Sequence, residues 1–282
     1  MFICIAGKND ISVNVLEYLL ERKNDRYELG IVCNQNESGI DSWQKSLRCF
    51  AEKRNVKEYT LQEMYGIREL LFLSLEFDKI IDPDKFVDAR LFNIHFSLLP
   101  QYRGMYTSAL PILHGNNKSG VTLHKIDSGI DTGDIIAQRT ITLEEDDTSR
   151  DLYFRCIKEG TELVIENIDK LINGDFVAWP QKKEGATYFG RDEIDYSNLK
   201  IDLNRTAEQV KNQIRAFYFP EYQYPKVYGK NIRKAVITDR RSKKKPGEII
   251  EETDGYIIVS TIDYDVILQY EIDKQNCDNK NY

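Results

Sequence analysis

An amide, an imidazole and a carboxylate are the side chains of this sequence whose types and spacing suggest chemistry. Asn93 and His95 are two residues apart in an apolar run typical of a strand, so both side chains should point to the same face. An irregular loop follows, and open α/β sheets bind ligands at such strand ends. The segment 127–134 (Asp-Ser-Gly-Ile-Asp-Thr-Gly-Asp) can form a tight loop that presents a carboxylate to a neighbouring strand end.

Taken singly, each of these features has an ordinary structural explanation. A histidine at a strand end is more often a hydrogen-bonded structural residue than a catalyst, and the segment 131–134 is a good turn. His114 and His124 are assigned structural roles, because no polar residues of the sequence are arranged around them. No Cys or Ser lies beside a base in a motif, which argues against a covalent enzyme nucleophile.

Together, the two segments resemble the formyltransferase family that uses N10-formyltetrahydrofolate. This family includes methionyl-tRNA formyltransferase, glycinamide ribonucleotide formyltransferase and the sugar-nucleotide N-formyltransferases. Residues 93–100 (Asn-Ile-His-Phe-Ser-Leu-Leu-Pro) fit its pattern position by position, and Asp131 follows His95 after 36 residues, as in the family. The resemblance covers roughly residues 1–180. It implies that Asn93, His95 and Asp131 form the catalytic triad, that N10-formyltetrahydrofolate is the co-substrate and that the protein needs no metal.

The chemistry of formyl transfer suits these side chains. An unprotonated amine attacks the formyl carbon, and a tetrahedral oxyanion forms and collapses. Asn93 can donate its amide N–H to the oxyanion, and His95 can take the proton of the amine near neutral pH. Asp131 could orient His95, stabilise its cationic form or pass a proton through water to the leaving nitrogen. No metal-ligand spacing is visible in the sequence.

Two further segments resemble the sugar-nucleotide N-formyltransferases: Ala6–Asp10 at the first strand end and Tyr102–Met105. The resemblance implies that the substrate-binding residues include Lys8, Asn9, Arg103 and Met105. Lys8 and Arg103 could meet diphosphate charge, and Asn9 could hydrogen-bond sugar or phosphate. A solvated surface lysine is an equal alternative for Lys8.

An aromatic segment at 217–225 offers rings that could stack on a pyrimidine base, and Tyr222 is the candidate platform for thymine. The alternative is that these rings form the core of a small module. We therefore expect formylation of the amine of a dTDP-linked amino-dideoxy sugar, dTDP-4-amino-4,6-dideoxyglucose, for a surface polysaccharide such as the lipopolysaccharide O-antigen. The resemblance also implies a homodimer, and we expect the small β module with its aromatic segment to be the contact surface.

Other functions remain open at this point. Methionyl-tRNA formyltransferase is the main alternative, because residues 200–245 carry thirteen Lys and Arg against four Asp and Glu. A solvated basic turn is the simpler interpretation, so nucleic acid is not the expected partner. Two other functions remain as alternatives: a protein that binds folate or a nucleotide sugar without turnover, and a formyl-folate hydrolase.

An α/β sheet should position these residues. Apolar runs at 2–6, 27–33, 70–75 and 91–94 alternate with a helix capped at Asn9 or Asp10 and a second helix at 42–53, which predicts a Rossmann-like, mostly parallel sheet. The first turn has one glycine where a dinucleotide fingerprint needs three, so NAD and FAD are disfavoured.

Beyond this core, residues 120–127 and 134–141 should form a hairpin. A long helix should follow, with a capping box at Thr148 and Asp151 and a stop at Asn173-Gly174. Residues 179–198 are typical of a linker. We then expect a helix at 206–217, a small β-rich module and a loose tail at 277–282. The predicted domains are 1–185, the Rossmann-like catalytic domain, and 186–282, a helix plus β module.

Composition sets the broad class. The chain has 282 residues, of which 41% are hydrophobic and 30% charged, values ordinary for a globular protein. No apolar run reaches the roughly 18 residues of a membrane span, and the start lacks the features of a signal peptide, so we expect a cytoplasmic protein. With a net charge of −7, the molecule as a whole does not attract a polyanion. The five cysteines are scattered along the chain, which favours reduced thiols over a disulfide scaffold.

Overall fold

The computed structural model describes residues 1–22 and 26–270 and divides into two compact units. The first unit contains residues 1–107, 118–142 and 153–190. The second contains residues 108–117, 143–152 and the chain from 191 onward. The tail expected at 277–282 lies outside the described residues, and the expected domain boundary after residue 185 stays a prediction.

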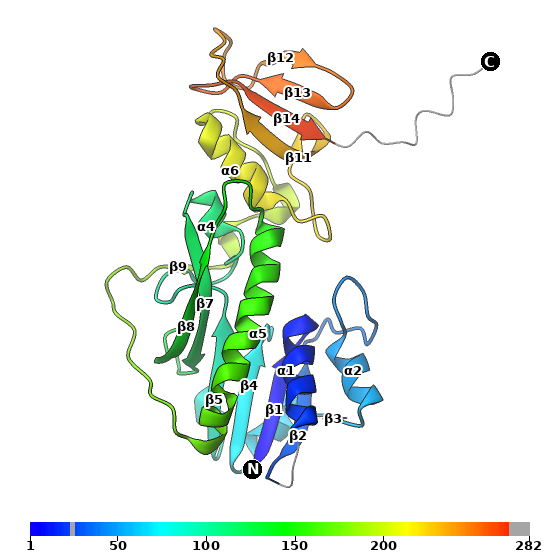
Figure 1. Ribbon diagram of the computed structural model, residues 1–282, viewed down its shortest axis with the longest axis vertical. Helices are drawn as coiled ribbons and strands as arrows, with labels where there is room; N and C mark the ends of the chain where they lie inside the picture. The colour runs from blue at the N-terminus through cyan, green and yellow to red at the C-terminus, as the bar shows by residue number, and fades with distance from the viewer. Residues whose placement is uncertain (23–25, 271–282) are drawn as a thin grey trace, which may run out of the picture. The chain divides into compact units, whose positions relative to one another are not determined.

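The first unit is built on a seven-stranded sheet in the order β3-β2-β1-β4-β5-β7-β8 (Figure 1). The first five strands of this order are parallel, and β7 and β8 are antiparallel to their neighbours. The bounds are β1 Phe2–Gly7, β2 Glu28–Cys33, β3 Lys57–Glu58, β4 Leu70–Leu75, β5 Ala89–His95, β7 Lys118–Lys125 and β8 Ile135–Thr142. The expected Rossmann-like, mostly parallel sheet is therefore confirmed.

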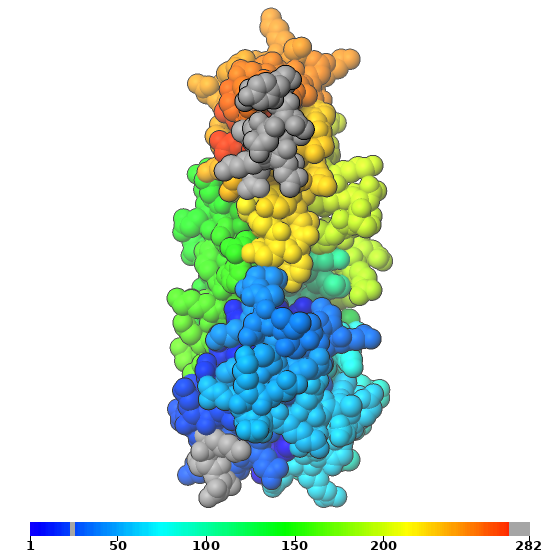
Figure 2. Space-filling view, turned by 90° about the vertical axis from the view of Figure 1, so that its right-hand side faces the viewer, coloured from blue at the N-terminus to red at the C-terminus, as the bar shows by residue number. Residues whose placement is uncertain are grey.

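Helices cover this sheet because its central strands are apolar on both faces. Strands β1 and β4 are buried along their whole length, as parallel strands between helical layers must be. The helices are α1 Asn9–Glu21, α2 Leu47–Lys53, α3 Leu61–Tyr65 and α5 Ser149–Asn173, whose first residues belong to the second unit. Figure 2 shows α2 and α3 on the outer surface of the first unit.

Helix α5 packs closely on the sheet because of a glycine. A Cβ added at Gly160 would lie 3.2 Å from a side-chain carbon of Ile11 and 3.3 Å from one of Ile94. The absence of a side chain at Gly160 thus lets the helix backbone approach both α1 and β5. This contact supports β5 from behind, near its carboxyl end.

The start of α1 differs from the expectation. Its N-cap is Lys8, which makes no side-chain capping bond, so the expected caps Asn9 and Asp10 are wrong. Both residues lie in the first turn, and their side chains are used for tertiary contacts instead. Asp10 Oδ1 accepts the backbone N–H of Lys45 at 2.8 Å, and Asn9, at φ 65°, turns its amide toward neighbouring polar groups.

The other helix boundaries follow from local hydrogen bonds. At α5, Thr148 N–H donates to Asp151 Oδ2 at 2.9 Å and Asp151 N–H donates to Thr148 Oγ1 at 3.3 Å, so the predicted capping box is confirmed. The helix ends at Asn173, as expected. Helix α2 begins at Leu47 rather than at residue 42, because Ser46 caps it by accepting the N–H of Cys49.

The second unit combines a helix with a small antiparallel sheet. Helix α6 (Ala207–Phe217) starts with a capping box at Thr206, and its buried side packs on the sheet β10-β11-β14-β13-β12. The strands are β10 Lys226–Val227, β11 Lys230–Ile237, β12 Ile249–Glu252, β13 Tyr256–Val259 and β14 Val266–Tyr270, and a short helix α4 spans Leu110–Leu113. The expected C-terminal β-rich module is therefore confirmed.

The region expected to be a linker, 179–198, contains secondary structure. Strand β9 (Tyr188–Phe189) pairs in parallel with β6 (Arg103–Gly104), and two 3₁₀ helices follow at Arg191–Glu193 and Tyr196–Asn198. The turn-rich composition concealed a strand of only two residues, which a sequence pattern cannot indicate. The β6–β9 pair matters for function, because it fixes the position of Arg103 and Gly104 in the segment that follows β5.

Two further expectations concern the whole chain. The four cysteines among the described residues are free thiols; Cys4, Cys33 and Cys156 are buried and Cys49 is partly buried. In the described ranges, no helix combines the length and the apolar character that a membrane span requires.

Candidate active site

Three polar side chains meet at the carboxyl end of β5. Asn93 and His95 lie on the same face of this strand, and Asp131 comes from the loop between β7 and β8. The amide nitrogen of Asn93 is 3.4 Å from Asp131 Oδ1, and His95 Nδ1 is 3.4 Å from Asp131 Oδ2. The His95 side chain is 8% exposed and that of Asp131 13%. The amide, imidazole and carboxylate predicted from sequence therefore form one nearly buried cluster.

The loop at 126–134 holds Asp131 through backbone and side-chain contacts. Asp131 Oδ2 accepts the backbone N–H of Gly104 at 2.9 Å, and the amide of Gln181 donates to the carbonyls of Asp131 and Gly133, both at 2.8 Å. The loop also passes very close to β7, since a Cβ added at Gly133 would lie 1.9 Å from the carbonyl oxygen of Lys125. Glycine is therefore required at position 133.

The hydrogen-bond network assigns the proton of the His95 ring. Nε2 is 2.7 Å from the carbonyl oxygen of Tyr102, a distance that requires Nε2 to carry the hydrogen. In the neutral ring, Nδ1 then holds the lone pair and faces Asp131. Burial lowers the pKa of His95 below its ordinary value, although Asp131 and the Tyr102 carbonyl act to raise it. The ring is therefore neutral at pH 7, and Nδ1 is its proton acceptor.

The carboxylate of Asp131 is the permanent charge of the cluster. Burial acts to raise its pKa, but the rings of His95 and His124 and the N–H of Gly104 outweigh this effect and hold the pKa below the usual range. Asp131 is thus ionised at neutral pH. Protonation of His95 at Nδ1 would create an ion pair with it.

A second histidine belongs to this cluster, although no sequence motif marks it. His124 on β7 is the register partner of Asn93 and is buried. Its Nδ1 donates to the carbonyl of Lys125 at 2.7 Å, so Nε2 accepts the amide of Asn93 at 3.1 Å and lies 3.5 Å from Asp131 Oδ1. The assignment of His124 to a role away from polar groups is therefore wrong. The alternating pattern predicts the strand at 120–127, but a pattern within one strand does not indicate its register against β5.

The turn after β1 presents two of the predicted substrate-binding residues. Lys8 and Asn9 follow the last residue of the strand and are half-buried. The amide of Asn9 donates to Glu76 Oε2 at 3.2 Å and contacts the hydroxyl of Tyr153 at 3.0 Å. No sequence motif marks Glu76, which follows β4, or Tyr153, which lies in α5.

Arg103 and Met105 lie on the segment that β9 fixes. The guanidinium of Arg103 donates to Gln181 Oε1 at 3.1 and 2.7 Å, and the backbone N–H of Met105 donates to the carbonyl of Phe189. The Met105 side chain is 41% exposed. Since Gln181 also binds the Asp131 loop, it connects Arg103 to that loop.

Tyr222 belongs to the second unit. It is exposed, and its ring centroid lies 4.9 Å from that of Phe219. The expectation that the aromatic segment offers an accessible ring thus agrees with its exposure. Its role in base stacking stays a prediction.

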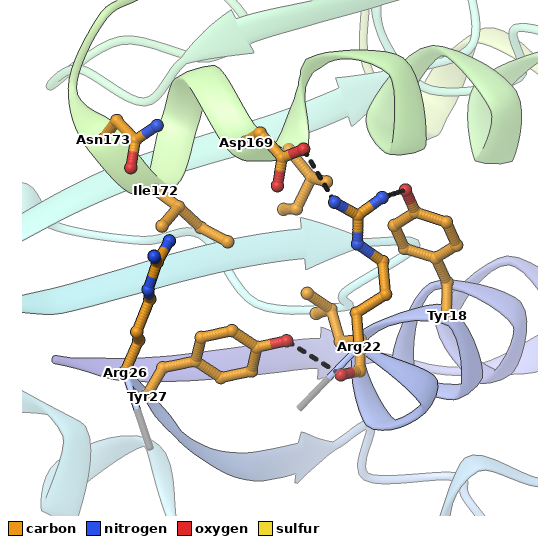
Figure 3. A pocket seen from close by; sticks show the side chains of 9 residues that line it. Tyr18, Arg22, Arg26, Tyr27, Asp169, Ile172 and Asn173 are labelled. Carbon is orange, nitrogen blue, oxygen red and sulfur yellow. Dashed lines mark hydrogen bonds and ion pairs between the residues drawn. The ribbon is translucent and has the colours of Figure 1, made fainter. Parts of the chain in front are cut away.

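Two cavities lie in the first unit. One, of about 280 Å³, is lined by Leu91 and Phe92 of β5, together with Ile126 after β7 and Phe176. Its lining ends at Phe92, the residue before Asn93 in β5. The other, of about 270 Å³, lies between the carboxyl ends of α1 and α5 (Figure 3) and contains no predicted site residue.

The groups that bind metals do not come together in the described ranges: residues 1–22 and 26–270 contain no set of three or more His, Cys, Asp or Glu side chains that could hold a metal ion.

Comparison with known proteins places this site in a family. The family described as formyl transferase matches residues 34–168, and its C-terminal domain matches residues 193–281. A methionyl-tRNA formyltransferase of Sulfurihydrogenibium sp. is 36% identical over 200 residues, which are 68% of this chain and 61% of the relative. The chain thus spans about three fifths of that relative's length.

Two solved structures are similar over almost the whole chain. WlaRD, a sugar 3N-formyl transferase solved in the presence of dTDP and 5-N-formyl-THF, is 43% identical with a TM-score of 0.88, covering 96% of this chain and 97% of WlaRD. The N-formyltransferase of Helicobacter canadensis, solved with folinic acid and dTDP-3-aminofucose, is 42% identical with a TM-score of 0.88, covering 95% and 99%. The resemblance inferred from residues 93–100 and Asp131 is confirmed: the chain belongs to the formyltransferase family.

Proposed function

We propose that this protein transfers the formyl group of N10-formyltetrahydrofolate to the amine of a dTDP-linked amino-dideoxy sugar. The observation that carries the proposal is the cluster of Asn93, His95 and Asp131, with contacts of 3.4 Å, in a chain that aligns over 96% of its length with a sugar N-formyltransferase. The relatives' folate and dTDP ligands support the choice of both substrates. The reaction needs no metal, because the triad supplies the acid–base and oxyanion functions.

The reaction uses the triad in sequence. The acceptor amine attacks the formyl carbon, and Asn93 exchanges its long contact with Asp131 for a hydrogen bond to the developing oxyanion, a donor whose loss typically costs ~10²–10³ in rate. His95 accepts the proton of the amine on Nδ1 and becomes paired with Asp131. The proton then passes to N10 of the folate as the C–N10 bond breaks. The products are the formamide and tetrahydrofolate.

The other predicted residues hold the substrates in this proposal. Among the described residues, the guanidinium of Arg103 donates only to the neutral amide of Gln181. Its positive charge is therefore available for the diphosphate. Lys8, Asn9 and Met105 contact the sugar nucleotide, and Tyr222 stacks on thymine.

The cavity beside β5 takes the pterin ring of the folate. Its walls include Leu91, Phe92, Ile126 and Phe176, which provide the apolar surface that a flat bicyclic ring needs, and the polar side chains of Arg90 and Lys125 also line it. A pterin there would lie along the strands that carry Asn93 and His124.

The position of the amine is the finer part of the proposal. The sequence resemblance favoured C4, without a physical argument. The two solved structures that are 42–43% identical are a sugar 3N-formyl transferase and an enzyme with dTDP-3-aminofucose, whereas a 4-N formyltransferase of Francisella tularensis is 23% identical. We therefore favour an amine on C3. The product would enter a surface polysaccharide such as a lipopolysaccharide O-antigen, and the enzyme would act in the cytoplasm as a homodimer.

One experiment tests this function. The purified protein is incubated with N10-formyltetrahydrofolate and a panel of dTDP-linked 3-amino and 4-amino sugars, and the mass gain of one formyl group is followed. We expect formylation of a 3-amino sugar, with tetrahydrofolate formed in equal amount. Tetrahydrofolate formed without any acceptor would indicate a hydrolase, and the absence of both products would contradict the proposal.

Methionyl-tRNA formyltransferase remains the second candidate, because a relative of that name is 36% identical over 61% of its own length. A function limited to binding folate or a nucleotide sugar explains the site less well. Binding alone does not require a base paired with a carboxylate beside an amide.

A further inference from the structure

The sheet has a topological switch point between β1 and β4. From these two central strands the order runs outward in opposite directions, to β2 and β3 on one side and to β5 on the other. Open α/β sheets bind ligands at the carboxyl ends of the strands at such a point. Lys8 and Asn9 follow β1 there, and Glu76 follows β4. Glu76 was not assigned a role by the sequence motifs.

Glu76 also lies beside the catalytic strand. Leu75, the last residue of β4, is the register partner of Ile94 on β5. Glu76 directly follows this pair on one chain segment and His95 on the other, so both residues lie at the carboxyl edge of two neighbouring strands. A sugar whose amine reaches His95 would therefore have its adjacent ring positions near Glu76.

The carboxyl group of Glu76 has a built environment. The hydroxyl of Tyr153 donates to it at 2.9 and 3.0 Å, and the amide of Asn9 at 3.2 Å. Gln44 holds the Tyr153 hydroxyl in place by donating to it at 2.7 Å. Two donors occupy two of the roughly four acceptor positions of a carboxylate, so the group retains capacity for a further hydrogen-bond donor.

The left-handed backbone of Glu76 and the burial of its carboxyl group both cost folding free energy. The residue has φ 58°, a left-handed conformation that its side chain disfavours, and Asn34 holds its carbonyl with a 2.8 Å hydrogen bond. Burial raises the pKa of Glu76 to about 7, although Tyr153, Lys8 and Asn9 act to lower it. A buried carboxyl group with a strongly raised pKa, on a strained backbone at a strand end, is typical of a functional residue.

We propose that Glu76 is a specificity residue that accepts a hydrogen bond from the sugar hydroxyl next to the reacting amine. This inference rests on the proposed function. The hydroxyl is the expected partner rather than the amine itself, because a carboxylate on the amine would stabilise the ammonium form, which has no lone pair for attack. Asn9 and Tyr153 orient the carboxylate toward the sugar.

Glu76→Gln tests the proposal, and Glu69→Gln is its matched control. Both glutamates flank β4, and both have left-handed backbones, with φ 58° and 51°. Glu69 lies at the amino end of the strand, away from the switch point. For Glu76→Gln we expect KM for the aminosugar nucleotide to rise about tenfold or more, the loss typical of a hydrogen bond to a charged group. KM for the folate and the affinity for dTDP alone should stay within about twofold.

A second measurement uses the wild-type protein and an acceptor that lacks the neighbouring hydroxyl. Its KM should be raised to the level of Glu76→Gln with the normal acceptor, and the substitution should add little to it. Equal kinetics of Glu76→Gln and Glu69→Gln, or full activity on the deoxy acceptor, would overturn the inference alone. Failure of the wild-type protein to formylate any aminosugar nucleotide would overturn the proposed function and this inference together.

Discussion

At the scale of single residues, Asp131 connects the members of the site. It lies 3.4 Å from both the Asn93 amide and the His95 ring. We predict that Asn93→Ala, His95→Ala and Asp131→Ala each reduce kcat at least about 100-fold. The first removes the oxyanion donor, the second removes the base, and the third removes the carboxylate that pairs with the base. Turnover is measured by formyl gain on the acceptor, with circular dichroism to verify folding. Near-normal turnover of His95→Ala would remove the base assignment.

The protonation of His95 can be measured directly. The chain has three histidines, so NMR titration of their ring carbons is readily assigned with single variants. We expect a pKa for His95 below about 6.5, because burial disfavours the imidazolium. Asp131 favours the charged form, so Asp131→Asn should lower this pKa further. A pKa above the ordinary value, or a rise in Asp131→Asn, would contradict the assignment of burial as the dominant effect.

His124 acts on catalysis through Asn93. Its Nε2 accepts the Asn93 amide at 3.1 Å and thereby sets the direction of the other N–H. We predict that His124→Leu lowers kcat about tenfold with KM for both substrates nearly unchanged, because the amide loses its orientation but the binding surfaces remain. His124→Gln offers a replacement acceptor and should recover most of the rate. Equal losses in both variants would indicate a purely structural role.

At the scale of elements, the loop at 126–134 depends on a backbone contact. A Cβ at Gly133 would overlap the carbonyl of Lys125, whereas one at Gly66 meets nothing within 4 Å. Gly133→Ala should therefore displace Asp131 and lower kcat by at least about tenfold, and Gly66→Ala should leave it unchanged. Kinetics and thermal unfolding of both variants check this. A fully active Gly133→Ala enzyme would show that the loop tolerates the displacement.

Elements with strong local signals were predicted well. The apolar strands at 2–6 and 70–75 and the capping box of Thr148 and Asp151 are set by neighbours in the chain, so pattern and propensity suffice. Asn9 has the same capping chemistry, but Glu76 and Tyr153 bind its side chain instead. A competition between a local cap and distant partners cannot be decided from the sequence.

At the scale of the whole molecule, the charges oppose binding of nucleic acid. The net charge is −7, and several cations of the basic stretch 200–245 have acidic partners. Lys211 pairs with Glu145 and Asp146, and Lys234 also pairs with Asp146. These carboxylates, from residues 143–152 of the second unit, neutralise part of the stretch that resembled a phosphate-binding surface.

We therefore predict that initiator methionyl-tRNA is not formylated and is bound only weakly. Filter binding between about 50 and 200 mM salt should show a small dependence on salt, because few phosphates are neutralised. A steep loss of affinity over this range, together with transfer of formyl to the tRNA, would favour the second candidate function.

The sequence by itself determined the fold class, the family and the identity of Asn93, His95 and Asp131, because strand patterns and a contiguous motif are local properties of the chain. Only the tertiary structure brought His124, Gln181 and Glu76 to the same strand ends. The reason is physical: the register of β7 against β5 and the close approach of α5 are fixed by the packing of the core, and a shift of one residue would turn His124 away from Asn93.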